Sequence, residues 1–230
     1  MAAKVIPVIN CTDFDCVKAR IGIAQEFLCD HGSEARSAVD SCDQCWVHID
    51  IADGGFTSGY ATWRNPEDLK NFRRDRHLKI EAHLMLTEPE LALESWLDVG
   101  VNRIIVHLET VGAIDTVVNI CESHGVEVWL AVAPQTPAEK AFPYLGIVKG
   151  CQVLAVRPGL PGQTMEPGTL EKIRVIRDAF PDLPIEVDGG VTVATVDKYK
   201  TAGATQVVAG SAIFSADDPA AAYRALTSSS

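Results

Sequence analysis

Residues 46–56 read WVHIDIADGGF, a run with the apolar character of a buried strand that nevertheless carries polar side chains. If Trp46 to Ile51 forms a β-strand, His48 and Asp50 point to one face and the aliphatic residues between them point to the other. Burying an imidazole beside a carboxylate costs free energy unless both groups are paired. The stretch therefore predicts a strand end at which His48 and Asp50 need a partner, a metal ion or a catalytic use.

Similar apolar runs alternate with helical patterns along the whole chain. The candidate strands lie at residues 4–9, 44–52, 78–86, 103–109, 127–133, 151–157, 184–190 and 206–213. Helical patterns lie at residues 13–29, 66–75, 89–99, 113–125, 138–145, 168–180 and 193–203. Near-continuous apolar strands that alternate with helices favour an α/β fold of the (β/α)8 TIM barrel type over an open doubly wound sheet. We expect a single domain over residues 1–230, with an insertion near 32–44 and a frayed tail at 227–230.

The composition narrows the classes of partner. The 230 residues include 20 basic and 31 acidic side chains, a net charge of -11, which argues against nucleic acid and against an anionic membrane as partners. No apolar run approaches the roughly 20 residues of a membrane span, and no signal peptide is evident, so we expect a soluble, cytoplasmic protein. Seven scattered cysteines favour reduced thiols over a disulfide framework. The oligomeric state stays open, a homo-oligomer included.

Polar residues gather at the carboxyl ends of the expected strands, where barrels carry their chemistry. His48 and Asp50 end one strand, His83 lies near the end of the next, and Asp188 ends the strand at 184–190. Taken singly, a strand histidine is more often a satisfied rim residue than a metal ligand. Taken together, two imidazoles and two carboxylates favour one divalent cation, with Zn²⁺, Fe²⁺, Mn²⁺ and Co²⁺ all suitable. His107 and Glu109 are expected to be rim or supporting residues.

Glycine-rich loops follow the last strands. They are RPGLPGQ (157–163), DGGV (188–191) and AGSAIF (209–214), which contribute Gly159, Gly162, Gly189, Gly190, Gly210 and Ser211. Glycine lets backbone amides approach an anion, and barrels often bind phosphate between the loops after strands 7 and 8. Each loop alone is better explained by tight turns, but the adjacent loops after strands 7 and 8 together favour phosphate.

A metal beside a phosphate suggests a phosphorylated sugar whose oxygens bind the cation. Asp50 and Asp188 would then flank the sugar. One carboxylate could remove a proton next to the carbonyl while the other returns a proton to the opposite face, which is epimerisation.

The motifs resemble those of the ribulose-phosphate 3-epimerase family. HIDIADGGF, EAHLML, VHLET, RPGLPGQ, EVDGGV and AGSAIF occur in that family's order, and the similarity runs from IPVINCTDF to the last helix. The resemblance implies a (β/α)8 barrel that interconverts ribulose 5-phosphate and xylulose 5-phosphate with a divalent metal. It also implies metal ligands at His48, Asp50, His83 and Asp188, an acid/base pair at Asp50 and Asp188, phosphate contacts at the six residues of the glycine-rich loops, and a substrate contact at Met85.

The chain departs from the family pattern around the expected sugar. The family usually reads PSIL where this chain has PVIN (7–10), and methionine where it has Ala52 and Leu154. Pro161 replaces a residue with a backbone donor. These changes leave another ketose phosphate, such as allulose 6-phosphate, as an alternative substrate. They also leave a non-catalytic barrel that binds a sugar phosphate. The related decarboxylases and synthases need DxKxxD, and Asp50 to Asp53 contains no lysine.

Overall fold

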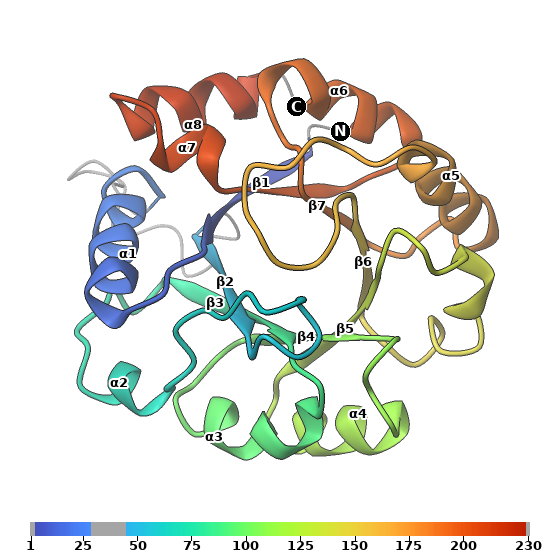
Figure 1. The fold of residues 1–230 in the computed structure, drawn as a ribbon, viewed down its shortest axis with the longest axis horizontal. Coiled ribbons are helices and arrows are strands. Elements are labelled where there is room, and N and C mark those ends of the chain that lie inside the picture. Colours follow the sequence, from blue (N-terminus) through green and yellow to red (C-terminus); the bar gives the residue numbers. More distant parts are fainter. Residues whose placement is uncertain (1–2, 29–44, 229–230) are drawn as a thin grey trace.

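Parallel strands close into a barrel at the centre of the computed structural model, which describes residues 3–28 and 45–228 (Figure 1). The strands follow one another around the barrel in chain order, and β8 pairs with β1 to close it. Their bounds are β1 (Lys4–Ile9), β2 (Trp46–Ala52), β3 (Lys79–Met85), β4 (Arg103–His107), β5 (Glu127–Val132), β6 (Gly150–Leu154), β7 (Ile185–Asp188) and β8 (Gln206–Ala209). The expected single-domain (β/α)8 barrel is confirmed.

Helices surround the barrel as an outer ring (Figure 1). They are α1 (Phe14–Leu28), α2 (Glu67–Lys70), the 3-10 helix η1 (Pro89–Ala92), α3 (Leu93–Leu97), α4 (Ile114–Ser123), the 3-10 helix η2 (Ala138–Lys140), α5 (Thr169–Ala179), α6 (Val193–Ala202), α7 (Ser211–Phe214) and α8 (Pro219–Ser228). The helix expected at 66–75 is reduced to α2, and that at 89–99 is divided between η1 and α3. The pattern at 138–145 gives only η2, because Pro143 has no amide hydrogen to continue a helix.

Alternation along the strands separates two layers of buried side chains. Val47, Ile49 and Ile51 point outward into the main apolar core beneath the helices. His48 and Asp50 point into the barrel, as expected, and both are buried. The parallel register sets Asp50 beside His83 on β3, so side chains on neighbouring strands meet at the same height. Strand parity and register thus bring the polar residues to one end of the barrel.

The interior of the barrel is filled toward the amino ends of the strands by Trp46, Arg103 and Trp129, which we call the basal plug. The Arg103 guanidinium carbon lies 4.3 Å from the Trp46 ring centroid and 4.0 Å from that of Trp129. Its nitrogens pair with Glu81 and Glu127. The three plug side chains are almost fully buried, so the barrel is a packed core below the polar site.

One sequence expectation about the cysteines is wrong. Cys11 and Cys16 form a disulfide that links the end of β1 to α1, because the loop between strand and helix turns back and brings the two side chains together. Cys121 and Cys151 are buried free thiols, as expected. Of the described helices, none combines the length and apolar character needed to cross a membrane.

Two expectations fall wholly or partly outside the described residues. The insertion near 32–44 lies outside them. Of the expected frayed tail, Thr227 and Ser228 end α8, and residues 229–230 are not described.

Candidate active site and metal centre

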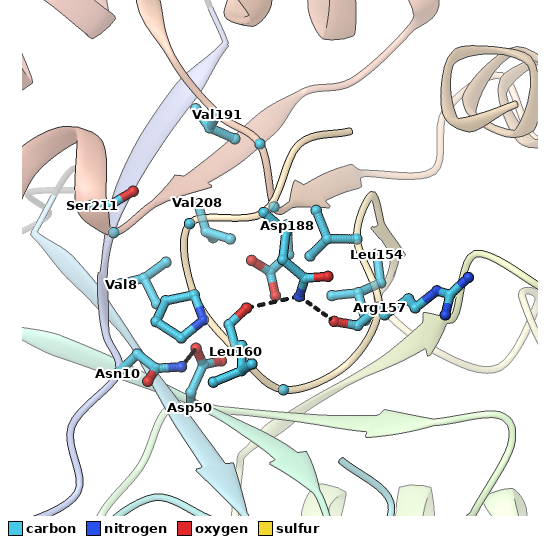
Figure 2. A pocket seen from close by; sticks show the side chains of 18 of the residues that line it. Val8, Asn10, Asp50, Leu154, Arg157, Leu160, Asp188, Val191, Val208 and Ser211 are labelled. Carbon is cyan, nitrogen blue, oxygen red and sulfur yellow. Dashed lines mark hydrogen bonds between the residues drawn. The ribbon is translucent and has the colours of Figure 1, made fainter. Parts of the chain in front are cut away.

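A cavity of about 500 Å³ opens at the carboxyl ends of the strands. Asp50 and Asp188 lie at its floor, and the loop that carries Leu160 extends across it (Figure 2). Every residue of the three glycine-rich loops that we singled out lines this cavity, namely Gly159, Gly162, Gly189, Gly190, Gly210 and Ser211. Met85 lines it as well. The structure therefore brings the expected metal and phosphate residues to one opening.

The four expected metal ligands converge on one point. Nδ1 of His83 lies 3.2 Å from Nε2 of His48, 3.2 Å from Oδ1 of Asp50 and 3.5 Å from Oδ2 of Asp188. One donor atom from each of the four residues lies within 4.8 Å of every other. Two nitrogens and two carboxylate oxygens are a donor set that first-row divalent ions accept. The four residues could therefore hold a cation.

Glu81 and Arg103 fix the orientation of His48. Nδ1 of His48 lies 2.8 Å from Oε1 of Glu81, and Nη1 of Arg103 donates to Oε2 of the same carboxylate at 2.5 Å. Because a carboxylate accepts, Nδ1 of His48 carries a hydrogen and its Nε2 points to the other ligands. Burial opposes charge on His48, but hydrogen bonds to Asp50 and Glu81 raise its pKa well above the usual value. A bound cation would take the place of the Nε2 proton.

A second chain of hydrogen bonds orients His83. Nε2 of His83 lies 2.8 Å from Nε2 of His107, and Nδ1 of His107 lies 3.1 Å from Oε2 of Glu109. Glu109 accepts from Nδ1 of His107, so Nε2 of His107 accepts from Nε2 of His83. Burial is the main cause that lowers the pKa of both histidines, which favours neutral rings. Nδ1 of His83 is then left with a bare lone pair that faces the other three ligands.

The two central carboxyl groups have opposite preferences for a proton. Burial opposes the charge on Asp50, but hydrogen bonds from His48 and His83 outweigh it and lower its pKa. Burial, together with the charge of Asp50, raises the pKa of Asp188 to about 7. Carboxyl groups whose pKa values are driven apart in one site can serve as base and acid.

The lone pair of His83 gives an independent reason to expect a cation here. The bare Nδ1 of His83 faces Oδ1 of Asp50 at 3.2 Å, and without a hydrogen or a cation between them these two atoms repel. A divalent ion among the four donor atoms removes that repulsion. The residues present therefore fit a metal.

The loop after β7 needs glycine for steric reasons. Gly189 has φ +103°, and a Cβ there would lie 2.5 Å from Cγ2 of Val156. Gly190 has φ +63°, and its Cβ would lie 2.9 Å from the backbone nitrogen of Met165. Only glycine allows this loop to approach the loop after β6 so closely.

Most of the residues that depart from the family pattern line the cavity, but one of them does not. Val8, Leu154 and Pro161 line the cavity, whereas Ala52 is fully buried and does not. The side chain of Arg157 is 72% exposed and pairs with Glu166 at 3.3 Å, in keeping with a surface charge.

Sequence reasoning missed several polar residues of the site. Asn10, immediately after β1, donates from Nδ2 to Oδ2 of Asp50 at 2.8 Å (Figure 2). Glu81 and Glu186 lie two residues before His83 and Asp188, and strand parity could have placed them on the inner face. No sequence signal distinguishes Asn10, because a single asparagine after a strand is also an ordinary turn residue.

Comparison with known proteins finds one family repeatedly. The model of the ribulose-phosphate 3-epimerase family matches residues 24–214. A ribulose-phosphate 3-epimerase of Schizosaccharomyces pombe is 30% identical over 221 residues, which are 94% of this chain and 89% of that protein. The cytoplasmic isoform of ribulose-phosphate 3-epimerase from Oryza sativa is 32% identical over 188 residues, covering 80% of this chain and 82% of its own.

Among solved structures, a 3-hexulose-6-phosphate synthase superposes with a TM-score of 0.66 at 20% identity, over 98% of this chain and 99% of that one. At this identity the likeness concerns the fold alone. The sequence matches are stronger and cover most of the chain. The chain therefore belongs to the ribulose-phosphate 3-epimerase family, whose members are isomerases.

Proposed function

We propose that the protein is a metal-dependent epimerase that inverts C3 of a ketose phosphate, with ribulose 5-phosphate and xylulose 5-phosphate as the interconverted pair. The observation that carries the proposal is the placement of two carboxyl groups, those of Asp50 and Asp188, at the floor of the cavity. Both contact Nδ1 of His83, and in the metal-free protein the pKa of Asp50 is lowered whereas that of Asp188 is about 7. A binding module has no use for such a pair.

Each carboxyl group has a distinct task in this proposal. Asp50, ionised, takes the proton from C3 on one face of the sugar, and the electrons of the C–H bond move into an enediolate. Asp188, protonated, returns a proton to C3 on the opposite face. The reverse reaction exchanges the roles, so the protonation states of the two groups alternate between turnovers.

His48, Asp50, His83 and Asp188 would hold the metal, which is Zn²⁺, Fe²⁺, Mn²⁺ or Co²⁺ in this proposal. When bound, a divalent ion supplies positive charge that stabilises the negative charge of an enediolate. The basal plug excludes water from the side of the site that faces the amino ends of the strands, because it fills the barrel there. Met85 adds an apolar surface beside the ligands.

The phosphate of the substrate would bind at the other side of the cavity. The loops that follow β6, β7 and β8 line it with Gly159, Gly162, Gly189, Gly190, Gly210 and Ser211. Backbone amides of such loops can bind phosphate oxygens at close range. The sugar would then extend from these loops to the two carboxyl groups.

Allulose 6-phosphate is a second candidate substrate because of Val8 and Leu154. These residues line the cavity where the family pattern has a serine and a methionine, so the hydroxyl and the sulfur of that pattern are missing from its wall. We infer a cytoplasmic location, in agreement with the rice relative, which is named as a cytoplasmic isoform.

Proton exchange in D₂O tests the proposal. Metal-reconstituted protein is incubated separately with ribulose 5-phosphate and allulose 6-phosphate, and NMR follows loss of the C3 proton and growth of the epimer. Exchange with epimer formation from one sugar supports the reaction and identifies the substrate. Absence of exchange with both sugars, in protein shown to contain metal, contradicts it and favours the barrel that only binds a sugar phosphate. Chelated protein is the control.

A further inference from the structure

The two oxygens of Asp50 have different partners, and Asn10 binds one of them. Its Nδ2 donates to Oδ2 of Asp50 at 2.8 Å (Figure 2). Oδ1 of the same carboxylate lies 3.2 Å from Nε2 of His48 and 3.2 Å from Nδ1 of His83. One oxygen therefore faces the ligand nitrogens, and the other is held from the side of β1.

The Asn10 amide is itself fixed from two directions. The Tyr60 hydroxyl donates to Oδ1 of Asn10 at 2.5 Å, and Nη1 of Arg20 donates to the Asn10 backbone carbonyl at 2.9 Å. Because Oδ1 accepts from Tyr60, the amide group cannot be reversed, and Nδ2 must be the atom that faces Asp50. The Arg20 guanidinium stacks over the Phe214 ring at 5.2 Å, so α1 and α7 support the arrangement.

The contacts of the Asn10 side chain differ from those of an asparagine in an ordinary turn. Tyr60 follows β2 and Arg20 lies in α1, so segments distant in sequence converge on one amide. Asn10 and Arg20 also line the cavity, together with Asp50. A hydrogen bond that served only the stability of the loop would not need to end on the carboxylate that faces the ligand nitrogens.

We propose that Asn10 is a positioning residue that keeps Asp50 turned so that Oδ1 alone faces the metal position and Oδ2 stays at the wall of the cavity. This inference rests on the proposed epimerase function for its kinetic part but not for its metal-binding part. A carboxylate without this restraint can rotate and present both oxygens to a cation. Loss of the restraint would misplace the base relative to C3, and a misplacement of about 1 Å can reduce a rate by about 100-fold.

The test compares Asn10→Leu, Tyr60→Phe and the control Asn119→Leu with the unaltered protein. Leucine has nearly the shape of asparagine but no donor. Tyr60→Phe keeps the Asn10 donor and removes one of its supports. Asn119 is exposed on α4, away from the cavity. Each protein is titrated with Co²⁺, and the visible absorption spectrum of the bound ion reports the ligand arrangement without any substrate.

In Asn10→Leu we expect a changed Co²⁺ spectrum, a kcat reduced by roughly 10-fold to 100-fold, and a KM within about threefold of the original. Tyr60→Phe should change the Co²⁺ spectrum and kcat in the same direction but to a smaller extent. Asn119→Leu should change neither the spectrum nor kcat. An unchanged spectrum in Asn10→Leu overturns the proposal. So does a raised KM with unchanged kcat, which would make Asn10 a substrate contact.

Two further outcomes are also decisive. If Asn10→Leu fails to fold, the spectrum of Tyr60→Phe decides in its place, since a spectrum equal to that of the unaltered protein contradicts the restraint. If the unaltered protein turns over neither sugar, the proposed function fails, while the Co²⁺ spectra of the variants still support or overturn the role of Asn10.

Discussion

His83 and His107 contact each other through their Nε2 atoms, which lie 2.8 Å apart inside the barrel. Only one of the two nitrogens can carry the shared hydrogen when both rings are neutral. Glu109 accepts from the far side of His107, so the hydrogen belongs to His83. A residue outside the metal ligands therefore decides which nitrogen of His83 faces the metal position.

We expect His107→Phe to weaken metal binding about 10-fold to 100-fold, because His83 loses the acceptor that fixes its tautomer. Isothermal titration with Zn²⁺ or Mn²⁺ measures the effect. His124→Phe is the matched control, since His124 is exposed at the end of α4. Equal affinities in the two variants would show that the contact between the rings does not orient the ligand.

The Asp188→Asn variant should lose turnover by about 100-fold or more while the fold stays intact, because asparagine cannot deliver the proton to the second face. The rate of epimer formation and the circular dichroism spectrum measure the two effects. Asp53→Asn offers a comparison on the same rim. Asp53 accepts from the amides of Gly55 and Thr87, so its loss should reduce stability more than turnover. Undiminished turnover in Asp188→Asn would refute the mechanism with two carboxyl groups.

Stability of the metal-free protein should depend on pH through Glu186. Burial and the charge of Glu81 raise the pKa of Glu186 to about 8, from an ordinary value of 4.5. Between these two pH values the unfolded chain has released the proton and the folded chain retains it, so stability falls as pH rises from about 4.5 to about 8.

Glu186→Gln removes this dependence and keeps an oxygen that can accept from Gln152. We expect the variant to gain at least ~1 kcal/mol of stability relative to the unaltered protein between pH 5 and pH 8, the worth of about one pKa unit. Urea unfolding at several pH values measures it. Glu171→Gln, at a side chain that is 70% exposed, should show no such trend. Parallel pH profiles for the unaltered protein and Glu186→Gln would contradict the raised pKa.

The Gly189→Ala variant should be destabilised by roughly 1–3 kcal/mol, because alanine is strained at a positive φ. Its Cβ would also lie 2.5 Å from Val156. The displaced loop should raise the KM for a ketose phosphate. Gly22→Ala in α1, where a Cβ meets nothing within 4 Å, should instead be more stable by roughly 0.5–1 kcal/mol. Thermal unfolding of both variants tests the contrast, which would be lost if Gly189→Ala were as stable as Gly22→Ala.

The fold and the central site follow from features that sequence encodes directly. Strand parity predicts that His48 and Asp50 share a face, and the barrel rule predicts that His83 and Asp188 join them. Strand parity also applies to Glu81 and Glu186, although their spacing alone does not reveal that Glu81 pairs with Arg103. Contacts between distant segments are different, because Asn10 meets Tyr60 and Asp50 only after the chain has folded.

The cysteine pair and the short helices show other limits. Spacing does not tell that the loop between β1 and α1 turns back to join Cys11 to Cys16. The sequence pattern at 66–75 is helical over several turns, yet α2 ends after Lys70. Beyond α2 the side chain of Arg74 donates to the carbonyl of Val99, a contact between segments distant in sequence that the local pattern does not encode.

Among the described residues, the basal plug closes the barrel below the site. Trp46, Arg103 and Trp129 fill the interior toward the amino ends of the strands, and the cavity opens at the carboxyl ends beside the Leu160 loop. A bound ketose phosphate would then lie between the metal and bulk water. If the proposed function holds, metal and sugar would share this opening, and we expect a bound ketose phosphate to slow the loss of the ion to a chelator.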